Sequence, residues 1–364
     1  MSRLASRMHV LPRAFARSLR ARRRPADPAR ILIAHHLLLG DTLMVTALLA
    51  RLRARYPRAA IDMTVAPAYM SLYATRPYGV EALAYDPRMP GTARAVTRRG
   101  PYDLAIVPGD NRYCLLARAA GARWIVAFAR DSPGWKNLVA DELVAWPARP
   151  ANLADMFALL SGEGDERYDP MAWPAPPHRP YTPPAAPYAV LHVGAGSPLR
   201  HWPAPRWMAL ARRLAGGVPA LNIVWSAGPG ETGLIEAIDP SRQYASLAGR
   251  LDLPQMWRLL AGAALLVAPD TGITHLAKLT GTPTACLFGP GSDALFGAGR
   301  FWREHRFAPV IEADFPCRDQ KTVFKRELAW VRRCQRGLDH CAAPACMHAL
   351  EVERVLAACR GVLA

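Results

Sequence analysis

The stretch that decides the fold reads VAPDTGITHLA and occupies residues 267–277. An apolar run ends in proline, an Asp-Thr-Gly turn follows, and the next residues have the pattern of a helix. In a parallel sheet such a turn lies at the carboxyl edge, where the free backbone N–H groups of residues 271–274 would face a ligand. The pattern predicts a site for a phosphate or pyrophosphate, with Asp270 accepting hydrogen bonds from sugar hydroxyls. The alternative is a plain helix cap, in which Asp270 or Thr271 only closes the helix and His275 is a packed residue.

Two further glycine loops follow apolar runs in the same half of the chain. One reads LHVGAGSPLRHWP at residues 191–203, and its small residues Gly194 and Gly196 would let the backbone approach a phosphate. Arg200 follows, and a guanidinium can contact two phosphate oxygens at once. The other reads AGPGE and ends at Glu231, which would either bind ribose hydroxyls or simply start a helix. The first loop also suits an ordinary turn, because it is neither a full dinucleotide-binding fingerprint nor a P-loop.

Apolar runs and helical stretches alternate along the chain. The runs predict strands at 31–34, 61–65, 102–107, 124–128, 188–193, 221–226 and 265–268, and helices are expected at about 42–56 and 205–215. This alternation predicts an α/β fold with parallel sheets covered on both faces by helices. Seven prolines in one stretch indicate a stiff linker between two such domains, with a cleft between them. The expected parts are a basic tail, a first domain, the linker, a second domain and a last helix, at 1–30, 31–172, 173–187, 188–346 and 347–364.

The turn after the first predicted strand carries Gly40-Asp41. A carboxylate at that edge can act as a general base, whereas an N-cap carboxylate would only close the following helix, and the residues alone favour the cap. The chain contains no Asp-x-Asp pair, so a divalent-metal site of that type for a diphosphate is not indicated. The charge of a leaving diphosphate would then be met by helix termini and Arg200.

The charge of the chain is strongly basic and unevenly distributed. The formal net charge is +17, and residues 1–30 hold nine arginines and one acid. Apolar residues recur at helical spacing in this tail, at Leu4, Met8, Leu11, Phe15 and Leu19. The pattern is compatible with a basic amphipathic helix on an anionic membrane surface, although Pro12 interrupts it, and equally with a disordered, solvated extension. Nucleic acid is disfavoured, because aromatic residues do not alternate with the basic ones.

The sequence excludes an integral membrane protein, because no apolar run reaches the ~18–20 residues of a spanning helix. The tail also lacks the apolar core of a secretory signal. With seven cysteines, an odd number, the chain is expected in a reducing compartment.

Taken together, these segments resemble the heptosyltransferase family of bacterial glycosyltransferases, glycosyltransferase family 9, which builds the inner core of lipopolysaccharide. The resemblance covers about residues 31–300 and is most specific at three places. These are Leu-Gly-Asp with its helix at 39–56, Arg-His-Trp-Pro at 200–203, and the run from Asp270 through Gly-Thr-Pro at 281–283 to Leu-Phe-Gly-Pro at 287–290. It implies a GT-B fold, in which two Rossmann-like domains face one another across a cleft. It also implies inverting, metal-independent sugar transfer from ADP-heptose, with no cofactor.

The resemblance also assigns roles to residues. By that similarity Asp41 is the general base, and Arg200 stands near the diphosphate where the family usually has lysine. Glu231 matches the ribose-binding carboxylate, and Leu251 lies where an apolar residue packs on adenine. The remaining matched positions surround the phosphates and the sugar: Gly194, Gly196, Thr271 and Gly272 at phosphate, Asp270 on the heptose and His275 close by.

The family resemblance implies a lipid-linked core oligosaccharide as acceptor. It predicts a cytoplasmic protein peripheral to the inner face of the membrane, with residues 1–30 at the anionic surface and no nucleic-acid partner. The sequence departs from the family at Ala195-Gly196, where hydroxyl residues are common, and at His35-His36. Three alternatives follow: a relative that uses another nucleotide-sugar, one that modifies a protein acceptor, or a non-catalytic paralogue that binds nucleotide-sugar.

Four cysteines lie within thirty residues of one another, at 317, 334, 341 and 346. Thiolates in this number can hold zinc or iron, and protein-glycosylating relatives carry a cysteine-bound iron. Because the chain has no Cys-x-x-Cys here, reduced or buried thiols are the favoured interpretation, with no metal. The basic stretch around them, residues 318–336, suits either acidic sugars and phosphates of an acceptor or a solvated helix face.

Overall fold

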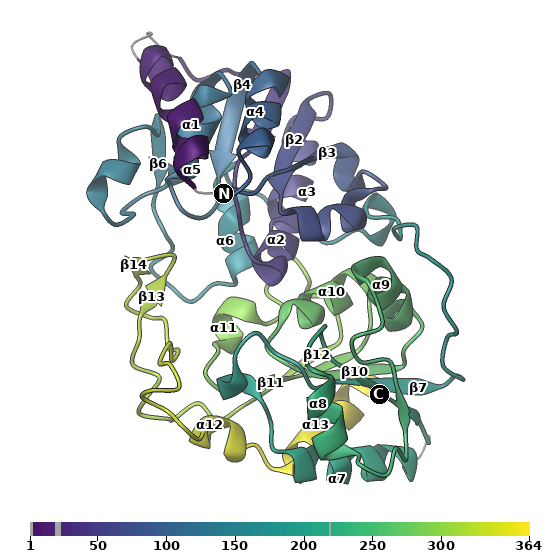
Figure 1. Cartoon of the computed structure of the whole chain (residues 1–364). Helices are drawn as coiled ribbons and strands as arrows, with labels where there is room; N and C mark the ends of the chain where they lie inside the picture. The colour runs from purple at the N-terminus through teal and green to yellow at the C-terminus, as the bar shows by residue number, and fades with distance from the viewer. Residues whose placement is uncertain (1–2, 19–22, 218–219) are drawn as a thin grey trace. The chain divides into compact units, whose positions relative to one another are not determined.

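The computed structural model describes residues 3–18, 23–217 and 220–364. The chain forms two compact units, each with one parallel sheet flanked by helices (Figure 1). Unit 1 comprises residues 1–176 together with 322–329, and unit 2 comprises residues 177–321 and 330–364. The chain therefore passes between the units inside the proline-rich stretch, and again on either side of residues 322–329.

Unit 1 is built on a six-stranded parallel sheet in the order β3-β2-β1-β4-β5-β6. Its strands are β1 (Arg30–Ile33), β2 (Ala60–Val65), β3 (Val80–Ala84), β4 (Tyr102–Val107), β5 (Ala122–Phe128) and β6 (Glu142–Val144). Its helices are α1 (Arg3–Ser18), α2 (Leu39–Met44), α3 (Thr46–Arg55), α4 (Pro90–Arg99), α5 (Tyr113–Ala119) and α6 (Leu153–Leu159). Short 3-10 turns lie at Pro67–Tyr73, Pro77–Gly79, Gly134–Asn137 and Pro170–Ala172. The order reverses direction at β1, and the carboxyl ends of β1 and β4 lie side by side, where ligands bind in doubly wound sheets.

Unit 2 repeats this plan, with the strand order β12-β11-β10-β7-β8-β9. Its strands are β7 (Tyr188–His192), β8 (Asn222–Ser226), β9 (Ala245–Ser246), β10 (Leu265–Pro269), β11 (Thr284–Phe288) and β12 (Phe307–Ile311). Its helices are α7 (Ala204–Ala215), α8 (Thr232–Ile238), α9 (Leu253–Ala261), α10 (Gly272–Thr280), α11 (Asp293–Phe296), α12 (Ala345–His348) and α13 (Val352–Leu363), with a 3-10 turn at Pro198–Arg200. The helices α7 and α13 cover one face of the sheet, around a core that includes Trp207 and Trp225. The α/β class expected from the sequence is confirmed.

The N-terminal segment is a helix, and Pro12 does not end it. Helix α1 packs on α4 and α5, and its buried side chains are Ser6, Val10 and Ala14. The imidazole Nε2 of His9 lies 2.8 Å from the hydroxyl of Thr97 on α4. Proline removes one backbone hydrogen bond and is tolerated here because it lies on the exposed side of the helix. The disordered-tail alternative is therefore wrong for residues 3–18, while Leu19 lies outside the described residues.

A hairpin from late in the chain belongs to unit 1. It consists of β13 (Thr322–Val323) and β14 (Arg326–Glu327), which pair in antiparallel fashion. The guanidinium of Arg326 is buried, lies 3.3 Å from the carboxylate of Asp131 and donates to the side chain of Asn111 and to the carbonyl of Ala129. A buried cation needs such partners, so this contact anchors the hairpin. The sequence analysis predicted that residues 322–329 belong to the second domain. That prediction is wrong because the pattern of apolar residues gives no sign of the buried ion pair that joins the hairpin to unit 1.

One further expectation is adjusted. The helix expected at 42–56 is two helices, α2 and α3, which meet at Val45. Among the residues that the structure describes, no helix is long and apolar enough to cross a membrane.

Candidate functional site

The loops of unit 2 gather the predicted nucleotide-sugar residues at one edge of its sheet. Strands β10, β7, β8 and β9 are neighbours and run parallel, so the loops after them meet at the carboxyl edge. These loops, together with the start of helix α10, carry the predicted donor residues Gly194, Gly196, Arg200, Glu231, Leu251, Asp270, Thr271, Gly272 and His275.

Asp270 is the buried carboxylate of this edge. It follows β10 directly and is only 5% exposed, and its Oδ2 has no hydrogen-bond partner in the described chain. Burial raises the pKa of Asp270, against the charges of Arg200, Lys278 and Arg333. Arg200 donates to the backbone carbonyl of Asp270 at 2.6 Å, and its Nη1 lies 4.0 Å from the carboxylate. Because a buried polar atom is normally paired, the open oxygen indicates a missing polar partner.

Two backbone N–H groups at the N-terminus of α10, beside Asp270, make no hydrogen bond within the described chain. Thr271 is the N-cap of α10, and its hydroxyl accepts from the backbone N–H of Ile273 at 3.3 Å. The backbone N–H groups of Thr271 and Gly272 have no acceptor in the described part of the chain. The two interpretations of this turn therefore hold together: the threonine side chain caps the helix, while two backbone donors stay open to an anion.

Glu231 ties two glycine loops together. Its carboxylate accepts from the backbone N–H of Ala195 at 3.0 Å and of Gly228 at 2.7 Å. A Cβ at Gly194 would lie 2.0 Å from Glu231 Oε2, so a side chain there would displace the Glu231 carboxylate, whereas a Cβ at Gly196 would meet nothing within 4 Å. Each carboxylate oxygen keeps one acceptor position, so Glu231 holds the loops and can still accept from a ligand hydroxyl.

His275 lies deeper than the ligand-facing residues. It is 3% exposed, and its Nδ1 lies 3.2 Å from the Nζ of the buried Lys278. Burial, aided by Lys278 and Arg200, lowers the pKa of His275 well below its usual value. The packed-residue interpretation therefore describes His275 best. Lys278, which the sequence analysis missed, also donates to the carbonyl of Phe296 at 2.8 Å and so fixes α11 against α10.

In unit 1, Asp41 is in the first turn of α2 and is half-buried. The N-cap of α2 is Leu38, so Asp41 is not the cap residue that its sequence context favoured. Its carboxylate lies near the phenol of Tyr69, whose pKa is raised chiefly by burial and also by Asp41. The interpretation of Asp41 as an N-cap is therefore wrong, because Leu38 occupies that position.

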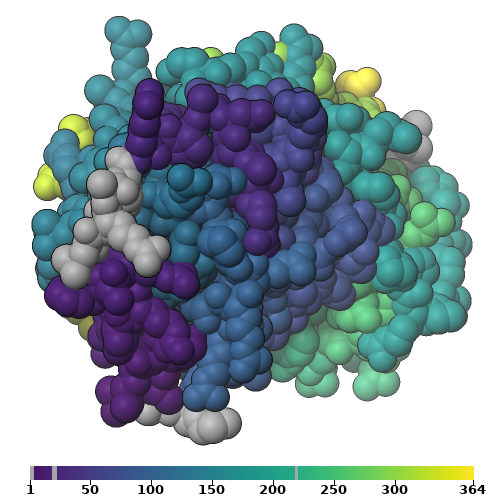
Figure 2. Space-filling model, turned by 90° about the horizontal axis from the view of Figure 1, so that it is seen from above, coloured from purple at the N-terminus to yellow at the C-terminus, as the bar shows by residue number. Residues whose placement is uncertain are grey.

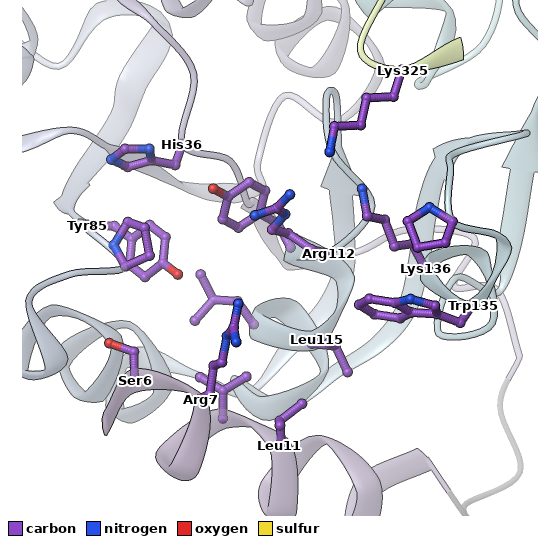
Figure 3. Close-up of a pocket in the computed structure, with 15 residues that line it drawn as sticks. Ser6, Arg7, Leu11, His36, Tyr85, Arg112, Leu115, Trp135, Lys136 and Lys325 are labelled. Carbon is purple, nitrogen blue, oxygen red and sulfur yellow. The ribbon is translucent and has the colours of Figure 1, made fainter. Parts of the chain in front are cut away.

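A cavity of about 490 Å³ in unit 1 is both basic and apolar (Figure 3). Its cations come from four separate segments: Arg7 on α1, Arg112 before α5, Lys136 after β5 and Lys325 in the hairpin. Apolar and aromatic side chains complete the wall, among them Leu11, Tyr85, Leu115 and Trp135. Sequence reasoning missed this cavity. One signal was available, since Arg112 and Lys136 each follow a strand at its carboxyl end.

The cavity has more cations than acids around it. Lys136 lies 3.1 Å from Asp110 and 3.2 Å from Asp131, and Arg112 also pairs with Asp110. Burial acts to raise the pKa of Asp110, but hydrogen bonds from Arg112 and Lys136 hold it below its usual value. Neither Arg7 nor Lys325 has a carboxylate within 4 Å in the described residues, so both remain available to an anion.

The C-terminal cysteines are all free thiols in the structure. Burial, and then the neighbouring Cys334, raise the pKa of Cys317. Within residues 3–18, 23–217 and 220–364, no group of three or more His, Cys, Asp or Glu side chains is arranged to hold a metal ion. The thiols therefore offer no ready-made metal site, and the absence of metal remains a prediction.

Comparison with known proteins identifies the family of this chain. The model of glycosyltransferase family 9 (heptosyltransferase) matches residues 94–325. The chain belongs to this family.

Individual relatives agree. Over 134 residues the chain is 34% identical to lipopolysaccharide heptosyltransferase 1 of Pseudomonas aeruginosa, a match that covers 37% of the chain and 36% of that relative. The chain thus spans about a third of the length of the curated relatives that it matches first.

Solved structures share the fold over most of the chain. The structure of Escherichia coli ADP-heptose lps heptosyltransferase II superimposes with a TM-score of 0.66 at 18% identity, and covers 92% of this chain and 98% of that one. The iron-containing dodecameric glycosyltransferase TibC of enterotoxigenic E. coli H10407 gives a TM-score of 0.56 at 12% identity, over 93% of this chain and 80% of that one. The fold is the two-domain GT-B type.

Proposed function

We propose that this protein transfers heptose from ADP-heptose to a lipopolysaccharide inner-core acceptor, with inversion at the anomeric carbon and without a divalent metal. The observation that carries the proposal is the carboxyl edge of unit 2. There a buried carboxylate oxygen of Asp270 that lacks a hydrogen-bond partner stands beside two open backbone donors and Arg200. These are the groups that bind a sugar diphosphate: a carboxylate that accepts hydrogen bonds from sugar hydroxyls, and backbone N–H groups and a cation that contact the phosphates.

The donor would bind as follows. The diphosphate lies against the N-terminus of α10, where Thr271 and Gly272 donate through their backbone and Arg200 supplies a permanent positive charge. Asp270 accepts hydrogen bonds from the heptose, and Glu231 accepts from the ribose. Leu251, half-buried in the loop before α9, packs on the adenine.

Transfer requires a base and a stabilised leaving group. Asp41 takes the proton from the acceptor hydroxyl as its oxygen attacks the anomeric carbon, and the bond from that carbon to the diphosphate breaks. ADP leaves with the bonding electron pair, and the negative charge that develops is met by the α10 donors and Arg200. No step calls on a metal ion, which agrees with the missing Asp-x-Asp pair.

The cavity of unit 1 suits the acceptor. Inner-core saccharides are acidic and lipid-linked, and the cavity offers surplus cations beside apolar walls. Lys325 comes from the basic stretch 318–336, and Arg326 of the same stretch is buried and structural. We accordingly propose a cytoplasmic enzyme, peripheral to the inner face of the membrane, without a nucleic-acid partner.

A donor panel tests the proposal. We expect calorimetry in EDTA to give selective binding of ADP-heptose over ADP-glucose, UDP-glucose and GDP-mannose. Preference for another nucleotide-sugar would keep the site and reject heptose. An absence of binding to a folded protein would favour a non-catalytic paralogue.

A second candidate is transfer to a protein acceptor, since the family resemblance includes relatives that modify proteins. It is distinguished by the acceptor, since turnover on a protein but not on a lipid-linked core saccharide would select it. The metal content of the purified protein is a further readout, because the structural neighbour TibC is iron-containing.

A further inference from the structure

Helix α1 exposes an apolar face that nothing in the described chain covers. The side chains of Leu4, Met8, Leu11 and Phe15 are 60%, 68%, 47% and 72% exposed. They recur at intervals of four, three and four residues, which places them in one narrow stripe on a helix that turns about 100° per residue. Ala5, Pro12 and Ala16 lie beside the stripe and are exposed as well. We call the four large side chains the apolar ridge.

The ridge is not what holds the helix to the protein. Attachment is made by Ser6, Val10 and Ala14, which are buried against α4 and α5 on another side of α1. Figure 2 shows α1, in the darkest purple, at the surface of unit 1. Four large apolar side chains in water serve no purpose in the fold, and a contiguous exposed patch of this kind marks an interaction surface.

Cations lie on both sides of the exposed apolar face. Arg7 is next to Leu11 on one side. On the other side, beyond Ala5, Pro12 and Ala16, Arg13 and Arg17 of α1 and Arg94 and Arg98 of α4 line a polar groove of about 450 Å³. Arg17 donates to the carbonyl of Ala119 at 2.9 Å and Arg13 to a carbonyl of its own helix, so both use backbone partners. No ion pair to a described carboxylate forms at any of the four arginines. Burial and the neighbouring arginines Arg13, Arg94 and Arg98 lower the pKa of His9.

We propose that the outer face of α1 docks the protein on an anionic lipid bilayer. The apolar ridge enters the boundary between headgroups and acyl chains, and the exposed arginines Arg7, Arg94 and Arg98 contact lipid phosphates. The charge selects this occupant, because an apolar face with arginines on both sides, none of them paired with a described carboxylate, complements a surface that is apolar inside and anionic outside. A second copy of the chain is a poorer match, since a symmetric contact would bring the same arginines together without acids.

The proposal rests on the proposed function in one respect, the lipid-linked acceptor. Arg7 and Leu11 of α1 also line the cavity of unit 1, as Figure 3 shows. A helix seated on the bilayer would therefore hold the cavity next to the lipid in which the acceptor is anchored. Membrane docking through α1 would thus explain how the cavity meets a lipid-linked acceptor, whichever sugar is transferred.

Vesicle flotation with the full chain tests the ridge. The probes are phosphatidylcholine vesicles and vesicles of phosphatidylcholine with phosphatidylglycerol. We expect binding to the anionic vesicles, and an at least roughly tenfold lower partition coefficient for Met8→Glu/Phe15→Glu. The matched control is Met171→Glu/Leu338→Glu, which places the same charges at exposed apolar positions elsewhere and should bind as the unmodified protein does.

A second pair of variants tests the arginines. Arg94→Glu/Arg98→Glu should lower binding to anionic vesicles by about tenfold or more, and added salt should lower the binding of the unmodified protein. Arg149→Glu/Arg360→Glu reverses as much charge at exposed positions away from α1 and should have little effect.

Two results would overturn the proposal. One is equal binding of ridge variant and unmodified protein to anionic vesicles. The other is a dimer that Met8→Glu/Phe15→Glu converts to a monomer without vesicle binding in either form. Titration of each variant with ADP-heptose and turnover on a delipidated acceptor separate this outcome from failure of the proposed function, because both should stay within about twofold when only membrane docking is lost.

Discussion

The two sheets end in edges of different construction. At the carboxyl edge of unit 2, much of the proposed recognition falls to backbone N–H groups and glycine loops, with Asp270 and Glu231 held among them. At the edge of unit 1, the proposed recognition falls to the long side chains of Arg7 and Lys325, which reach the cavity from separate segments. A backbone site offers a fixed geometry suited to one invariant group, whereas flexible cations tolerate an acceptor of varied outline. The difference fits a division between donor and acceptor binding.

The sharpest way to break this division is Asp41→Asn. We expect turnover to fall by about 10²–10⁴-fold, since an amide cannot accept the acceptor proton, while ADP-heptose affinity stays unchanged because Asp41 is in unit 1. Steady-state kinetics with calorimetry measures both. A parallel loss of donor affinity would show that the two edges do not act separately.

The units also share a feature, a buried neutral histidine at the end of a central strand. Burial lowers the pKa of His35 after β1 to about 3, aided by His36, and that of His192 in β7 to about 4. The unfolded chain takes up these protons near pH 6.5 and the folded chain does not. We therefore expect the free energy of unfolding to fall as pH decreases from about 6.5 toward 4, by roughly 2 kcal/mol per histidine at pH 5.

Urea unfolding at pH 7 and pH 5 checks this dependence. His192→Asn should flatten it, whereas His178→Asn, at an exposed position, should leave it as it is. An equal slope in His192→Asn and the unmodified protein would contradict the assignment of the effect to this buried group.

Arg200→Ala tests the side-chain part of the donor edge. Loss of a charged contact to phosphate should weaken ADP-heptose binding by roughly 10- to 100-fold, with partial recovery in Arg200→Lys. Arg212→Ala, on an exposed face of α7, is the matched control for calorimetry. Unchanged affinity in Arg200→Ala would remove this arginine from the donor site.

Gly194→Ala tests the backbone part. A new Cβ would lie 2.0 Å from Glu231 Oε2, so the carboxylate must move and give up a hydrogen bond that it accepts from Ala195 or Gly228. We expect a loss of about 1–3 kcal/mol in the free energy of unfolding. Gly196→Ala, where a Cβ meets nothing within 4 Å, should leave thermal unfolding unchanged. Equal melting temperatures of Gly194→Ala and the unmodified protein would show that the Glu231 carboxylate can move without loss of stability.

The same contrast explains what the sequence could predict. The donor edge lies in short contiguous loops that follow strands, so Gly194, Arg200 and Asp270 were recognisable from local patterns. How deeply a residue of this edge is buried could not be predicted from local patterns. The burial of His275 against Lys278, for example, depends on the contact of Lys278 with α11. The acceptor cavity combines Arg7 with Lys325, more than three hundred positions apart, and no periodicity reports such a pairing. The N-cap interpretation of Asp41 failed because α2 begins three residues earlier than the local pattern suggested.

The weakest expected effect concerns the hairpin that unit 1 takes from late in the chain. Lys325 is exposed, without a described carboxylate partner, and reaches the cavity from a backbone anchored by Arg326. Lys325→Ala removes one of several cations, so the KM for the acceptor should rise about three- to tenfold while kcat and donor affinity hold. Lys321→Ala removes an equal charge just outside the hairpin and should change neither constant. A fall in kcat with an unchanged KM would mean that Lys325 acts on the reaction itself, and the acceptor would then reach the catalytic groups by another surface of unit 1.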